Sequence, residues 1–173
     1  MNFNGSIVTA QVTDHNDTEV FAQHDGVTLA IDRSELAELP EVGSDVEGFA
    51  YENKQGQARL TTKVPTVGRD HYAFAKVVEV RKDLGVFVNI GLPDKDIVVS
   101  EDQLPEISRL WPQKGDQLMV ALTVDKKDRM WGNLADESII HAVANRAKPE
   151  QMNADVTATA YPVSYTHLTL PTN

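Results

Sequence analysis

The stretch RKDLGVFVNIG, residues 81–91, decides how this chain is expected to fold. It places Gly85 directly before a Val-Phe-Val run, and β-branched and aromatic residues of this kind are typical of a strand. Glycine inside a strand weakens it and often marks a bend or the close approach of another backbone. The stretch therefore predicts a curved strand over 85–90, with Gly85 and Gly91 at its two ends.

The same order of segments occurs twice along the chain, at low identity. Residues 43–62 align with 115–134 at a shift of 72 residues, and the segments upstream align at a shift of 66, which pairs Phe21 with Phe87. A repeat of this kind indicates one structural unit used twice. Because the two shifts differ by six residues, we expect an insertion of that size between the strands of the second copy, near residues 92–95 and 105–112.

Alternating and β-branched segments bounded by turn residues predict five strands in each copy. They lie at 6–13, 18–23, 26–31, 44–52 and 57–63, and again at 72–81, 85–90, 96–100, 116–125 and 129–134. A short helical turn is expected after each third strand, capped by Asp32 or Ser34 in the first copy and by Ser100 in the second. This order predicts an all-β chain of two tandem five-stranded OB-fold barrels. A longer helix over 136–150, capped by Asp136, follows the second barrel.

The charge and composition of the chain exclude some classes of function. The chain of 173 residues has a net charge of −10, which argues against a protein that coats nucleic acid by bulk electrostatics. The charge is uneven: residues 1–68 carry four basic and eleven acidic side chains, whereas residues 69–149 carry twelve and thirteen. A polyanion is therefore expected at the second copy. No segment is apolar enough to span a membrane, and the absence of cysteine suits the cytoplasm.

Signals of catalysis are missing. The five histidines have no metal-ligand spacing, no serine or cysteine nucleophile motif accompanies them, and no glycine-rich loop could hold a phosphate. The acidic residues are scattered over expected turns, where a solvated role is the simpler interpretation. We therefore expect a protein that binds and is not an enzyme, with no cofactor and no metal.

Several segments resemble the S1 RNA-binding repeat of the largest small-subunit ribosomal protein. LGVFVNIG matches the repeat's second strand, SEL (34–36) and SEDQL (100–104) its short helix, and VGSDV and KGDQL the entry to its fourth strand. The chain from residue 1 to about 162 resembles more closely the conserved virulence factor B family of bacterial RNA-binding regulators. In particular, YAFAKVVEV followed by LGVFVNIGLPDKDIVV is similar to that family's second domain.

The resemblance implies that the second barrel binds single-stranded RNA, or DNA, on its second and third strands. An OB barrel binds such strands by stacking bases on aromatic rings beside a positive groove. In the family motif an aromatic residue is preferred where Leu84 stands, and many repeats have a histidine where Val98 stands. The predicted binding residues are Phe87, Leu84, Tyr72, Phe74, Lys76, Arg81, Lys82, Lys126, Arg129, Trp131 and, in the first barrel, Phe21.

Structural interpretations stand beside these functional ones. Phe87 could equally belong to the core, and Trp131 to the packing of its barrel. Arg81 and Lys82 could form a solvated turn, and Tyr72 and Phe74 must share one side of their strand because strand side chains repeat every two residues.

The acidic first barrel is expected to be structural or to contact a protein partner, which makes a protein-interaction module the alternative function. Its Phe49 and Tyr51 are interpreted as alternating across the fourth strand, with one of them buried.

The predicted domains are a first barrel at 1–66, a second barrel with its helix at 70–148, and the truncated start of a third S1-like domain at 152–162. Residues 163–173 do not continue that domain. They resemble translated sequencing-adapter read-through, and a natural divergent tail is the alternative.

Overall fold

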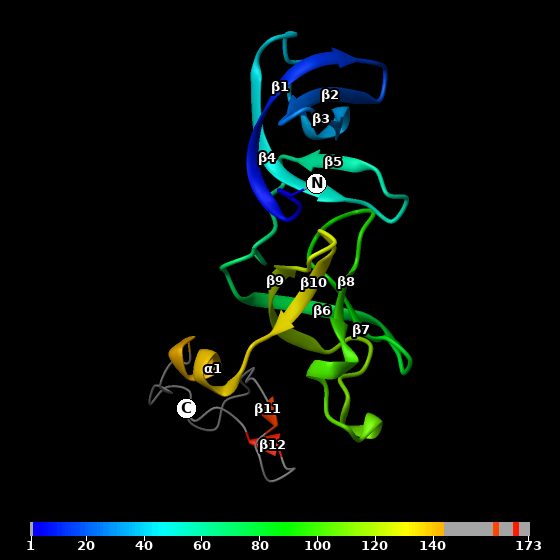
Figure 1. Cartoon of the computed structure of the whole chain (residues 1–173), viewed down its shortest axis with the longest axis vertical. Coiled ribbons are helices and arrows are strands. Elements are labelled where there is room, and N and C mark those ends of the chain that lie inside the picture. Colours follow the sequence, from blue (N-terminus) through cyan, green and yellow to red (C-terminus); the bar gives the residue numbers. More distant parts are fainter. Residues whose placement is uncertain (1, 144–160, 163–167, 170–173) are drawn as a thin grey trace.

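The chain forms two closed five-stranded barrels that stack along the long axis of the molecule (Figure 1). The structure is a computed structural model that describes residues 2–143, 161–162 and 168–169. The all-β class and the tandem OB-type barrels predicted from the sequence are confirmed.

The first barrel has the strand order β1-β2-β3-β5-β4. Its strands are β1 (Ser6–His15), β2 (Glu19–His24), β3 (Val27–Asp32), β4 (Asp45–Glu52) and β5 (Ala58–Thr61), with the 3-10 turn η1 (Arg33–Glu35) after β3. Asp32 caps this turn because its side chain accepts a hydrogen bond from the amide of Ser34. The hydroxyl of Ser34 first, and then this amide, lower the pKa of Asp32.

The second barrel repeats the plan in the order β10-β8-β7-β6-β9. Its elements are β6 (Ala73–Arg81), β7 (Gly85–Asn89), β8 (Ile97–Ser100), η2 (Glu101–Gln103), η3 (Ser108–Leu110), β9 (Gln117–Val124) and β10 (Met130–Leu134). The turn η3 lies within the predicted insertion. The helix α1 (Glu137–Val143) follows, and the Asp136 carboxylate accepts the amide of Ile139 at 3.0 Å, as expected of its cap.

The rest of that predicted helix, residues 144–150, lies outside the described residues. So does most of the predicted start of a third S1-like domain at 152–162, of which only β11 (Tyr161–Pro162) is described. It pairs with β12 (Leu168–Thr169) and with neither barrel.

Gly85 meets both conditions that require glycine in a strand, an unusual backbone conformation and the close approach of another strand. Its φ is +141°, and a Cβ added there would lie 2.0 Å from the carbonyl oxygen of Val99 on β8. Gly91 differs, because its φ is +103° but a Cβ would meet nothing within 4 Å. A side chain at Gly85 is therefore excluded by contact as well as by conformation.

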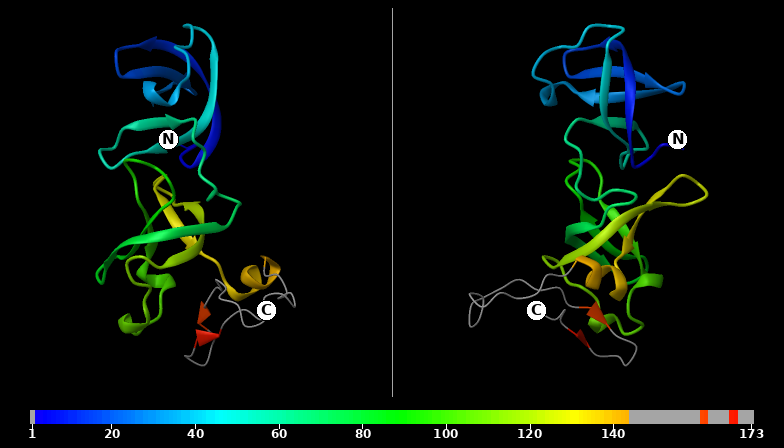
Figure 2. Two further views of the ribbon diagram at one scale, coloured as in Figure 1. Left: turned by 180° about the vertical axis from the view of Figure 1, so that it is seen from behind. Right: turned by 90° about the vertical axis from the view of Figure 1, so that its left-hand side faces the viewer.

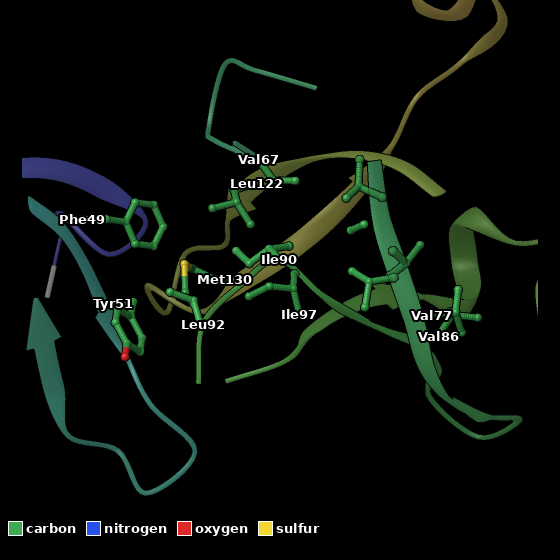
Figure 3. Close-up of a cluster of buried hydrophobic side chains, with 14 of the residues drawn as sticks. Phe49, Tyr51, Val67, Val77, Val86, Ile90, Leu92, Ile97, Leu122 and Met130 are labelled. Carbon is green, nitrogen blue, oxygen red and sulfur yellow. The ribbon is translucent and has the colours of Figure 1, made fainter. Parts of the chain in front are cut away.

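Phe49 and Tyr51 are both buried, each 2% exposed, which corrects the expectation that they alternate. They are two residues apart and so share the outer face of β4, where they pack against the core of the second barrel. Figure 3 shows both rings on the side of β4 that faces Leu92 and Met130. The first barrel thus uses outward aromatic residues to dock on its neighbour.

Asp94, in the loop between β7 and β8, fixes this junction by hydrogen bonds. Its carboxylate accepts the Tyr51 hydroxyl at 2.6 Å and the Asn53 amide at 3.1 Å, and it lies 3.6 Å from the Nε of Arg59. Burial first, and then the bond to Asp94, raise the pKa of the Tyr51 hydroxyl. The segment that joins the barrels is also fixed, since Arg69 donates to the carbonyl of Asn4.

Candidate nucleic-acid interface

A row of half-buried apolar side chains crosses the outer face of the second barrel. Phe87 on β7 pairs with Val98 on β8. Strand β10 runs parallel to β8 and pairs with it through Gly132 and Val99, which are both buried. The residues that precede this pair, Val98 and Trp131, are therefore neighbours on the outside. Phe87, Val98 and Trp131 form what we call the outer row.

Arg129 and Asp125 complete one end of the outer row. The Arg129 guanidinium lies 5.7 Å from the centre of the Trp131 ring, within the range of a cation–π contact. The Asp125 carboxylate accepts the Nε of Arg129 at 2.8 Å and the Nε1 of Trp131 at 3.0 Å. The Arg129 side chain is still 60% exposed, so a cation and a large ring are both offered to solvent at this place.

The other edge of the outer row carries opposite charges on β6. Glu79 lies opposite Phe87, and Lys76 lies opposite Asn89 on the same outer face of the sheet. Both β6 side chains are exposed. A β-bulge between Val77 and Glu79 sets this spacing, so the row is bordered by one anion and one cation.

Lys126, Arg81 and Lys82 are exposed at the two ends of the barrel. Lys126 lies in the β9–β10 hairpin that also carries Arg129. Arg81 ends β6 and Lys82 begins the β6–β7 turn, which is at the opposite end of the strands. The Arg81 guanidinium is 3.3 Å from the Asp83 carboxylate, so its charge has a local partner.

Three predicted residues lie away from the outer row. Tyr72 packs with Ala135 and Ile140 beneath α1, and its hydroxyl accepts the amide of Asn133 at 2.8 Å. Phe74 is 47% exposed but lies opposite Met119 on the β6–β9 side. Leu84 is half-buried in the β6–β7 turn, where its carbonyl accepts the amide of Glu101.

The first barrel has an equivalent row with different chemistry. Phe21 pairs with Ala30, as Phe87 pairs with Val98, and Ala30 pairs with Arg59, which stands where the second barrel has Trp131. Arg59 is only 16% exposed and lies 2.8 Å from the Glu19 carboxylate. Burial opposes the charge of Arg59, but the hydrogen bond and charge of Glu19 outweigh it and raise its pKa.

Asp125 was missed from the sequence, although the 72-residue shift places it opposite Asn53. Both residues close a hairpin before the fifth strand, and this correspondence was the available signal.

Among the described residues, no group of histidine and carboxylate side chains could hold a metal ion. Nor does any helix in that part of the chain have the length and apolarity to cross a membrane.

Comparison with known proteins agrees with the two-barrel fold. The profile of the CvfB first S1-like domain matches residues 72–133, and the S1 domain profile matches residues 4–63. Conserved virulence factor B of Staphylococcus epidermidis is 34% identical over 137 residues, which are 78% of this chain and 45% of that protein. The chain belongs to the conserved virulence factor B family. Its second barrel matches the family's first S1-like domain, which corrects the expected resemblance to the family's second.

Two further relatives extend over more of the chain. YitL of Bacillus subtilis is 34% identical over 157 residues, which are 91% of this chain and 52% of that protein. A crystal structure of a multidomain protein with nucleic acid binding domains from Streptococcus pneumoniae is 43% identical with a TM-score of 0.86, and covers 99% of this chain and 60% of that one. The chain thus spans about half the length of the curated relatives it matches.

Proposed function

We propose that this chain binds single-stranded nucleic acid, and RNA in particular, on the outer row of the second barrel. The carrying observation is the pair of half-buried rings, Phe87 and Trp131, beside the exposed guanidinium of Arg129. Base stacking on such rings contributes roughly 1–3 kcal/mol per base, and a nearby cation can bind the phosphates. The pneumococcal neighbour with nucleic acid binding domains supports the same class of ligand.

The proposal involves binding without chemistry. The face carries rings, one guanidinium and single carboxylates, which suit recognition and lack a nucleophile–base pair. As a member of the conserved virulence factor B family, the chain would act as part of a cytoplasmic post-transcriptional regulator. Binding by one barrel would be moderate, and further domains on a longer chain would raise it through effective concentration.

A titration with short single-stranded RNA at two salt concentrations tests this function. The full chain should bind at low salt, and log K should fall with log salt at a slope of about −0.7 per phosphate contacted. DNA of the same sequence, run in parallel, tests the preference for RNA. No detectable binding of either strand at low salt would remove this function from the chain.

A protein partner for the first barrel is the second candidate. Leu39 and Val42 are exposed in the loop before β4, and each directly follows an acidic residue, Glu38 and Glu41 respectively. An apolar pair framed by carboxylates suits a partner with a basic rim around an apolar centre. If this candidate is right, Val42→Asp weakens capture of that partner and leaves RNA binding unchanged.

A further inference from the structure

The two oxygens of the Asp125 carboxylate have separate tasks. Oδ1 accepts the backbone amides of Lys127 at 2.8 Å and Arg129 at 3.0 Å, which closes the β9–β10 hairpin. Oδ2 accepts only side-chain donors, the Nε of Arg129 at 2.8 Å and the Nε1 of Trp131 at 3.0 Å. One oxygen therefore shapes the backbone, and the other orients the two side chains at the end of the outer row.

Asn53, the equivalent residue of the first barrel, shows that these two tasks are independent. Its Oδ1 accepts the amides of Gln55 at 3.0 Å and Gln57 at 2.9 Å, so the β4–β5 hairpin is closed in the same way. Its second atom is a nitrogen, which donates to the side chain of Gln57 in the same hairpin at 3.0 Å and to Asp94 of the second barrel at 3.1 Å. An asparagine is therefore sufficient to close the hairpin, and the charge of Asp125 is not needed for that purpose.

The second oxygen of Asp125 limits what its partners can offer a ligand. The indole N–H of Trp131 already donates to Asp125, so the indole offers a ligand its ring face and no hydrogen-bond donor. Any of the bases can stack on a ring face, because every base has a flat face of its own. Arg129 has used its Nε and keeps its terminal nitrogens, on a side chain that is 60% exposed, for a phosphate.

We propose that Asp125 is the positioning residue of this interface, and that it makes Arg129 and Trp131 a clamp for one base and one phosphate without preference for base identity. This inference rests on the proposed function of the outer row. The same contacts, led by the amide of Arg129 and the indole of Trp131, hold the pKa of the Asp125 carboxyl well below its usual range. The anion is therefore present at neutral pH.

The substitution Asp125→Asn tests the proposal because it keeps Oδ1 and replaces Oδ2 with a donor. Asp128→Asn is the matched control, since it removes one negative charge from the same hairpin at a φ of 58°, which asparagine tolerates. Loss of a negative charge near a polyanion should by itself tighten binding. Positioning predicts the opposite for Asp125→Asn, a loss of about threefold to tenfold in affinity for single-stranded RNA.

Two results would overturn the proposal. The first is that Asp125→Asn binds RNA as tightly as Asp128→Asn, which would reduce Asp125 to a local charge. The second is that short strands of adenine, cytosine and uracil differ more than tenfold in affinity and that Trp131→Ala abolishes this difference. That result would mean that Trp131 reads the base.

A measurement without ligand separates this inference from the proposed function. The chain has two tryptophans, Trp111 and Trp131, and Trp111→Phe assigns their two indole N–H signals in an NMR spectrum. Asp125→Asn should shift the Trp131 signal and leave the Trp111 signal and the circular dichroism spectrum unchanged. An unshifted Trp131 signal refutes the positioning role even if RNA binds. A shifted signal in a chain that binds no RNA refutes the proposed function alone.

Discussion

The two barrels share one backbone plan but direct equivalent positions to different partners. Arg59 in the first barrel stands where Trp131 stands in the second, and Glu19 stands where Gly85 stands. In the first barrel these side chains form an ion pair that Asp94 of the neighbouring barrel joins. In the second barrel the same places leave a ring open to solvent. A repeated fold can therefore divide its outer faces between internal docking and an external ligand.

The junction shows how the difference is maintained. Both barrels meet by the ends that carry the hairpins before their fifth strands, as the views in Figure 2 show. The side-chain amide of Asn4 donates to the backbone carbonyl of Asp128 at 2.8 Å on one side of the contact. On the other side, the Asp94 carboxylate binds the Tyr51 hydroxyl. Because the contacts lie on two sides, we expect the barrels to move as one body.

Gly85→Ala should have the largest effect, because a side chain there enters the carbonyl oxygen of Val99. We expect a loss of at least about 4 kcal/mol in the free energy of unfolding, since few single changes exceed this value without such a collision. Chemical denaturation followed by circular dichroism measures the loss.

Gly91→Ala is the control for the backbone conformation alone. Its φ of +103° is also unfavourable for alanine, but the added Cβ meets nothing within 4 Å. We expect a cost of about 1–3 kcal/mol. Equal losses at Gly85 and Gly91 would show that conformation, and not contact, requires the glycine at the start of β7.

Asp94→Ala should separate the barrels. It leaves the Tyr51 hydroxyl without its acceptor in a half-buried place and removes one of the two acceptors of the Asn53 side-chain amide, which costs about 1–3 kcal/mol. We expect one unfolding transition to become two, seen by differential scanning calorimetry. Asp83→Ala, which removes an exposed carboxylate from the β6–β7 turn, should keep a single transition.

The effects of Trp131→Ala and Arg59→Ala on RNA affinity test whether the two barrels differ in ligand binding. Loss of one stacking ring should weaken RNA binding by about 1–3 kcal/mol, whereas the equivalent change in the first barrel should leave affinity unchanged. Phe87→Ala and Phe21→Ala form a second matched pair with the same expectation. Equal effects in both barrels would show that the first barrel also binds the strand, in spite of its ion pair.

The sequence predicted the strands well because alternation and turn residues are local signals. The ten strands lie within a few residues of the expected ranges, and both the Asp32 and Ser100 turns occur as predicted. The placement of side chains relative to the ligand face was harder. Tyr72 is covered by α1, and the docking role of Phe49 depends on the neighbouring barrel. Such contacts join residues far apart in sequence, where no periodic pattern reports them.

Tyr51→Phe should remove an alkaline sensitivity from the junction. Burial and Asp94 raise the pKa of the Tyr51 hydroxyl above its usual value of 10.0, so the folded chain retains a proton that the unfolded chain releases. The stability that this hydroxyl adds is present below pH 10 and is lost as the pH rises above it. Unfolding at pH 8 and pH 11 should therefore show a smaller difference for Tyr51→Phe than for the natural chain.

Glu79→Gln should have the smallest effect and the opposite sign. Glu79 is exposed and lies opposite Phe87, so its charge opposes a phosphate that approaches the outer row. Asp14 has the equivalent place opposite Phe21, and Asp14→Asn removes the same charge from the whole chain. For exposed charges we expect Glu79→Gln to tighten RNA binding by about twofold to threefold at low salt, and this gain should fade at high salt because ions screen it. Asp14→Asn should change affinity less. An equal gain from both substitutions would mean that net charge, and not the outer row of the second barrel, attracts the strand.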